Sequence, residues 1–174
     1  MMRSALHALV AGSLLLAACG DDGQNEPGTA TFAAEMTGAY TAALSGQAQF
    51  GVTLDNGFNA AGLALVLGDS GAARIFLVSS DTPRPLAGTY AIVASGLPAT
   101  SDTVFTGTLG YVVNGARQGF EIRGGTITLT RSAHNGVAGN FELSAVRTSP
   151  CCDPSPVQVV IAGTFDAAQF PQVF

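Results

Sequence analysis

The chain has 174 residues, a formal net charge of −5 and only 11% charged residues, and all of its basic side chains are arginines. With 47% hydrophobic residues, the composition excludes intrinsic disorder, because disordered chains are poor in apolar side chains and rich in charge. It also excludes nucleic acid as a partner, since seven arginines cannot form a basic surface that neutralises a run of phosphates. The length fits one ordinary domain.

Residues 1–18 have the features of a cleaved export signal. Arg3 supplies a short positive region, and residues 5–18 form an apolar stretch. A membrane-spanning helix needs about 20 apolar residues, so this stretch is too short to span a bilayer. It runs directly into Leu-Ala-Ala-Cys at residues 16–19.

The four residues Leu16, Ala17, Ala18 and Cys19 resemble the lipobox of bacterial lipoproteins, in which a Leu and two small residues precede a Cys. In that family the Cys thiol receives a diacylglycerol, the chain is cut before the Cys, and the new amine is acylated. The resemblance implies that Cys19 is the lipidated first residue of the mature protein. Two or three acyl chains hold a protein stably on a membrane. The alternatives are an ordinary cleaved signal with an unmodified Cys, and an uncleaved anchor.

Residue 20 suggests which membrane carries the anchor. In the Gram-negative lipoproteins that this signal resembles, an Asp after the Cys retains the protein in the inner membrane, whereas Gly20 stands here and is followed by Asp21 and Asp22. The resemblance therefore implies the outer membrane, with a periplasmic or a surface-facing domain. Residues 19–29 are polar and fit a flexible tether; their acidic side chains also fit a surface-export signal. We expect the folded domain to span residues 30–174.

Apolar and polar residues alternate with a period of two through most of residues 30–174. This alternation is typical of antiparallel strands that bury one face and expose the other. It predicts an all-β domain of about ten short strands, either a single antiparallel β-sandwich or a small β-barrel. The segments with this pattern are 31–36, 39–44, 47–54, 61–67, 74–79, 89–93, 103–113, 117–123, 126–130, 137–145 and 157–166.

Turn signals lie between these segments. Asn-Gly pairs occur at residues 56–57, 114–115 and 135–136, and they predict type I′ hairpin turns because both residue types tolerate positive φ. The Gly-Gly pair at 124–125 predicts a further turn. Residues 125–166 include loose Gly-polar-aromatic repeats similar to the closing strands of small all-β lipoproteins, a group that implies no particular chemistry.

Few residues suggest catalysis. His134 is the only histidine after the signal, it adjoins an Asn-Gly pair, and we expect it to be a solvated turn residue. A zinc site needs three or four converging ligands, and a GxSxG nucleophile motif is missing from the sequence. Glu121 and Glu142 fall on outward strand positions, where we expect cross-strand ion pairs with arginines. We therefore expect no catalytic residue, no metal and no cofactor.

The adjacent cysteines Cys151 and Cys152 lie in a proline-rich stretch. In an oxidising compartment they fit a disulfide between neighbours. Two further interpretations stay open: a pair of free or transiently oxidised thiols, and pairing with another chain or with a soft metal. Asp153 beside them disfavours an activated thiolate, because a neighbouring negative charge raises the pKa of a thiol.

Three functional hypotheses follow. The first is a lipid-anchored envelope protein that acts as a non-enzymatic binding or structural module, with the membrane and an envelope protein as partners. The second is a carrier of an apolar ligand, because segments 61–67 and 74–79 are apolar on both faces and would suit the wall of a barrel cavity. The third is a hydrolase with an unrecognised site.

Overall fold

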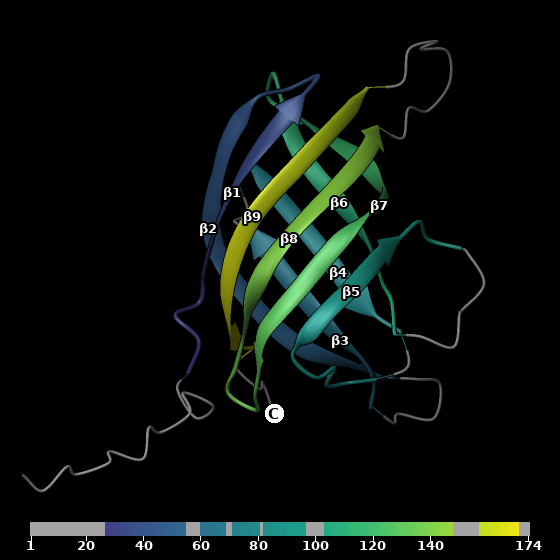
Figure 1. Cartoon of the computed structure of the whole chain (residues 1–174). Coiled ribbons are helices and arrows are strands. Elements are labelled where there is room, and N and C mark those ends of the chain that lie inside the picture. Colours follow the sequence, from purple (N-terminus) through teal and green to yellow (C-terminus); the bar gives the residue numbers. More distant parts are fainter. Residues whose placement is uncertain are drawn as a thin grey trace, which may run out of the picture.

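The computed structural model describes residues 27–54, 60–68, 71–80, 82–96, 103–147 and 157–170. Nine strands in these ranges form one closed barrel, shown in Figure 1. The all-β prediction is confirmed. The strands are β1 (Thr31–Gly38), β2 (Ala42–Leu54), β3 (Ala60–Gly68), β4 (Ala73–Ser79), β5 (Gly88–Val93), β6 (Phe105–Val113), β7 (Ala116–Ser132), β8 (Gly136–Arg147) and β9 (Gln158–Gln169).

The strand order around the barrel departs from chain order at one place. The order is β1-β2-β3-β4-β6-β5-β7-β8-β9, and β9 closes the ring by pairing with β1. Strand β7 is long enough to pair with two strands: Thr108 of β6 lies opposite Glu121, while Thr89 of β5 lies opposite Thr128. All the pairings are antiparallel except the short β5–β6 and β2–β9 contacts.

The predicted turn at residues 124–125 is wrong, because β7 runs without interruption through both glycines. Its register against β8 shifts between Ile122 and Gly124. A bulge of this kind bends a strand, and glycine suits it because it lacks a side chain. A Cβ atom on Gly125 would meet the carbonyl oxygen of Glu142. The glycines therefore allow a close approach of two strands, and the predicted segments 117–123 and 126–130 are one strand.

The Asn-Gly pairs have different outcomes. Asn114 and Gly115 have φ values of 51° and 79°, so the predicted type I′ geometry between β6 and β7 is confirmed. The pair at 135–136 does connect β7 to β8, but neither residue has positive φ, so type I′ geometry is wrong there. The carbonyl oxygen of Asn135 instead accepts a hydrogen bond from the backbone N–H of Gly28, at 3.2 Å. The third pair, 56–57, lies outside the described residues.

The barrel interior is filled by the inward-facing half of each alternating pattern. In β3 the side chains of Leu63, Leu65 and Leu67 are buried, while Val66 between them faces outward. All nine strands contribute to one continuous apolar cluster. Its largest fully buried side chains are Phe105, Phe120, Met36, Leu63, Leu65, Leu67, Ile75, Leu77, Leu109, Ile122, Ile127 and Leu129. The interior is thus packed in the manner of a small barrel whose side chains meet at its axis.

The chain enters the barrel through a polar clamp. The backbone N–H and the hydroxyl of Thr29 donate hydrogen bonds to Asp166 Oδ2, at 3.2 and 3.0 Å. Asp166 also forms an ion pair with Arg131 of β7. Residues 27–30 are therefore tied to β9 and to the β7–β8 turn before β1 begins.

Within the described ranges, no helix has the length and apolarity that a bilayer crossing requires. The predicted signal at 1–18, the lipidation site Cys19 and the pair Cys151 and Cys152 all lie outside the described residues.

Candidate functional site

A row of outward-facing positions across four strands contains three glycines and one arginine. In register, Gly68 of β3 lies opposite Arg74 of β4, Arg74 lies opposite Gly110 of β6, and Gly110 lies opposite Gly119 of β7. Because glycine carries no side chain, the wall is thin on both sides of Arg74. The Arg74 side chain consequently stands in a hollow of the outer surface.

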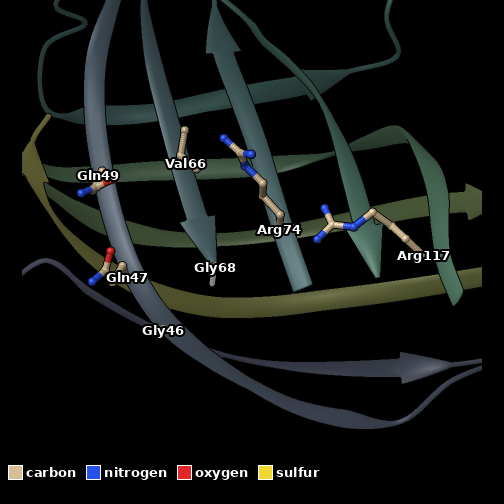
Figure 2. Close-up of a pocket in the computed structure, with 7 residues that line it drawn as sticks. All are labelled: Gly46, Gln47, Gln49, Val66, Gly68, Arg74 and Arg117. Atoms are coloured by element: carbon tan, nitrogen blue, oxygen red, sulfur yellow. The ribbon is translucent and has the colours of Figure 1, made fainter. Parts of the chain in front are cut away.

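This hollow has two lobes that share Arg74 and Arg117, and we call it the arginine groove. The first lobe has a volume of ≈ 490 Å³ and is shown in Figure 2. It is lined by Gly46, Gln47, Gln49, Val66, Gly68, Arg74 and Arg117. The second lobe has a volume of ≈ 610 Å³. It is lined by Arg74, Phe76, Ser95, Thr108, Leu109, Gly110, Arg117, Gly119, Phe120 and Glu121.

Arg117 reaches over β6 toward Arg74. It comes from the start of β7, and a Cβ atom on Gly110 would lie 3.6 Å from Arg117 Nη1 and 3.9 Å from its Cδ. Figure 2 shows the Arg117 side chain extending from β7 in the direction of Arg74. Gly110 therefore gives the Arg117 side chain its path across the sheet, and both arginines line one groove.

The guanidinium of Arg74 makes no hydrogen bond and no ion pair with any residue of the described ranges. The acidic residue of the groove, Glu121, is engaged elsewhere: its carboxylate lies 3.0 Å from Arg123 Nη2. This ion pair runs along β7, so the predicted cross-strand pair is wrong for Glu121, whose neighbour on β6 is Thr108. The groove thus presents positive charge on a protein whose overall charge is negative.

The edges of the groove carry amide side chains and an exposed aromatic side chain. Gln47 and Gln49 project from β2, opposite Gly68 and Val66 of β3. Phe76, next to Val66 in register, is 37% exposed and is one of four large apolar side chains that the described residues leave open to water. A ligand here would meet the guanidinium of Arg74, hydrogen-bonding amides and an aromatic surface.

Of the acidic and histidine side chains singled out in the sequence, Glu121 lies at this groove, whereas Glu142 and His134 lie elsewhere. Glu142 is exposed on β8 opposite Thr126, whereas Glu121 lies opposite Val146, so the two carboxylates share no cleft. His134 is exposed in the β7–β8 turn, where its Nδ1 accepts a hydrogen bond from Arg84 Nη2 at 3.2 Å. Among the described residues, no three His, Cys, Asp or Glu side chains gather as metal ligands would.

Sequence reasoning missed the groove because it treated each glycine and each arginine by itself. The glycines of the groove indicate a hollow only once the strand register aligns them with Arg74. These glycines are Gly68, Gly110 and Gly119. The pairing of β4 with β6, which skips β5, brings Arg74 to Gly110. Alternation alone does not reveal that strand order.

Comparison with known proteins returns no match: no family model, no curated protein and no solved structure is similar to this chain.

Proposed function

We propose that this chain is a lipid-anchored protein of the cell envelope, that its barrel is a non-enzymatic binding module, and that the arginine groove is the ligand surface. The observation that carries the binding role is the guanidinium of Arg74, which lines the groove and has no acidic partner in the described residues. The lipobox-like residues 16–19 support the location.

The ligand that this surface fits carries a carboxylate or a phosphate group. A guanidinium offers N–H donors in a planar fork that matches either group with two parallel hydrogen bonds. Charged residues make up only 11% of the chain, so an unpaired arginine in a hollow is not part of a generally charged surface. Phe76 beside it supplies apolar contact for the carbon skeleton that bears the anion.

Neither alternative gains support from a specific observation. A carrier of an apolar ligand needs an internal cavity, yet the inward-facing side chains of all nine strands pack into one cluster. A hydrolase needs a nucleophile next to a base. The buried hydroxyl of Ser79 instead donates to the Thr82 carbonyl and accepts from the N–H of Leu63, both at 2.8 Å, which is a structural role.

The test uses two labelled polyanions, polygalacturonate as the carboxylate probe and polyphosphate as the phosphate probe. Both are titrated against the full-length lipoprotein purified in detergent micelles. The variant is Arg74→Gln, and the matched control is Arg84→Gln, which removes the same charge from an exposed arginine outside the groove.

A charge-assisted hydrogen bond contributes about 1.5–3 kcal/mol, so we expect Arg74→Gln to weaken binding of the preferred probe by roughly 10-fold or more. Arg84→Gln should bind like the unmodified protein. The probe that binds identifies carboxylate or phosphate as the preferred group. Equal weakening by the two substitutions would show only a general effect of charge, and failure of both probes to bind the unmodified protein would contradict the proposal.

A further inference from the structure

A second surface lies at the end of the barrel at which the chain enters. This end is formed by residues 27–30, the β7–β8 turn and segment 82–87, and we call it the tether end. The N–H of Gly28 donates to the carbonyl of Asn135 in the β7–β8 turn, at 3.2 Å, and the carbonyl of Ala30 accepts from Ala48 of β2, at 2.9 Å. In Figure 1 the β7–β8 turn and the start of β5 lie at the lower end of the barrel.

Segment 82–87 crosses the tether end from one wall to the other. The carbonyl oxygen of Thr82 accepts a hydrogen bond from the N–H of Leu63 on β3, at 3.2 Å. Two residues later, Arg84 donates to His134 in the β7–β8 turn. Within this segment Pro85 is buried, whereas Leu86 is 80% exposed. Segment 82–87 therefore links β3 to the β7–β8 turn at this end of the barrel, and it carries an exposed apolar side chain.

The exposed apolar side chains concentrate at this end. The described residues leave four large apolar side chains exposed: Val52, Leu54, Phe76 and Leu86. Phe76 belongs to the arginine groove. Val52 and Leu54 continue the inward-facing series of β2 beyond the packed interior, and Val52 lies opposite Leu63, the residue that binds the crossing segment. Three of the four exposed apolar side chains thus share the end at which residues 27–30 join the barrel.

Chain length indicates what covers this surface. Cys19 precedes Pro27 by eight residues, and eight residues span at most about 29 Å even when fully extended. If Cys19 carries the acyl chains, the tether end is held within that distance of the lipid, whatever path residues 19–26 take. The exposed guanidinium of Arg84 adds positive charge at the same end, which suits anionic headgroups.

We propose that the tether end of the barrel rests on the lipid surface, with Val52, Leu54 and Leu86 inserted among the headgroups. The inference rests on the lipid anchor of the proposed function. It adds an orientation for the barrel. The tether end faces the lipid, and the arginine groove on the side wall stays open to ligands. Side chains of this kind enter the boundary between headgroups and acyl chains to a shallow depth.

The chain contains no tryptophan, which makes a single introduced tryptophan a clean reporter. Leu86→Trp places it on segment 82–87 at the tether end. The matched control is Thr41→Trp, because Thr41 is exposed in the β1–β2 connection, at the far end of β1 from Thr31. Each full-length lipoprotein is reconstituted into vesicles of phosphatidylcholine and phosphatidylglycerol with and without bromine on the acyl chains. Bromine quenches tryptophan only at short range.

We expect brominated lipid to lower the emission of the Leu86→Trp protein by about twofold and to leave the Thr41→Trp protein unchanged, because only the first reporter reaches the acyl boundary. Adding Leu54→Ser to the Leu86→Trp protein should reduce that quenching, because Leu54 is 58% exposed and its loss weakens insertion without disturbing the packed interior.

Equal quenching of the two reporters would overturn the orientation, as would quenching of neither. A second copy covering the same patch would shield the Leu86→Trp reporter from iodide in solution while leaving it insensitive to brominated lipid, and this result also overturns the proposal. Mass spectrometry of the same samples separates the two claims. A missing acyl group overturns the anchor and the orientation together, whereas an acylated protein with an unquenched reporter overturns the orientation alone and leaves the Arg74 test untouched.

Discussion

Arg131 of β7 and Asp166 of β9 form an ion pair across the intervening strand β8, where Ala138 lies between them in register. The same carboxylate accepts two hydrogen bonds from Thr29. One acidic side chain therefore joins β7, β9 and the entering chain at a single point.

The substitution Asp166→Asn removes the charge from this clamp while keeping its shape. The side chains of Arg131 and Asp166 are only 18% and 30% exposed, so the arginine would be left half-buried without its partner. We expect a loss of about 1–3 kcal/mol in the free energy of unfolding, seen as a midpoint shift in urea denaturation. Glu121→Gln is the control, because its partner Arg123 is 53% exposed and exposed pairs contribute less than about 1 kcal/mol. Equal losses in both variants would contradict the role of the clamp.

Neighbouring residues on β4 test the alternation of inward and outward faces. Leu77 is fully buried and Phe76 is 37% exposed. Leu77→Ala should cost about 2–5 kcal/mol in unfolding free energy, because it leaves a cavity in the core. Phe76→Ala removes a larger side chain and should nevertheless cost less than about 1 kcal/mol. Urea denaturation of the two variants checks this, and a larger cost for Phe76→Ala would show that the faces are assigned the wrong way round.

We expect a Gly→Ala substitution to have different effects on stability at two glycines of β6. A Cβ atom on Gly107 would meet the carbonyl oxygen of Phe76, whereas on Gly110 it would make only ordinary contact with the Arg117 side chain. Gly107→Ala should therefore destabilise the barrel by about 1–3 kcal/mol, while Gly110→Ala should stay within about 0.5 kcal/mol of the unmodified protein. Thermal unfolding compares them. Similar midpoints would contradict the packing of β4 against β6.

Gly110→Leu tests the path of the arginine side chain. A leucine at this outward position would occupy the space that Arg117 crosses. We expect the folded barrel to persist and binding of the preferred polyanion to weaken several-fold, comparable to the effect of Arg74→Gln. Circular dichroism reports on folding, and the polyanion titration reports on the groove. Undiminished binding would place the ligand elsewhere.

The sequence predicts most of the strands because each buries one face: the leucines of β3 and the Ile75–Leu77 alternation of β4 indicate their inward sides without any structure. The Gly-Gly pair in β7 misleads because glycine serves turns and bulges equally well, and only the strand paired with it decides which occurs. Asn135 misleads in the same way, since its carbonyl accepts from Gly28, a residue more than a hundred positions away.

The arginine groove escapes sequence analysis for a related reason. Arg74 and Arg117 are 43 positions apart in the chain, and they line one groove because β4 pairs with β6 rather than with β5. Periodicity gives the face on which a residue lies, but not the neighbour on the next strand. The interaction of Arg131 with Asp166 across β8 depends on strand order in the same way. The proposed roles of Cys19, Cys151 and Cys152 stay predictions, because these residues lie outside the described ranges.

Intact mass spectrometry of the protein extracted from its native membrane, followed by fragmentation of the N-terminal peptide, checks the proposed lipid anchor. We expect a chain that begins at Cys19 and carries a diacylglycerol on its thiol and an acyl chain on its amine. A chain that still contains residues 1–18, or one that begins at or near Cys19 with an unmodified thiol, would contradict it.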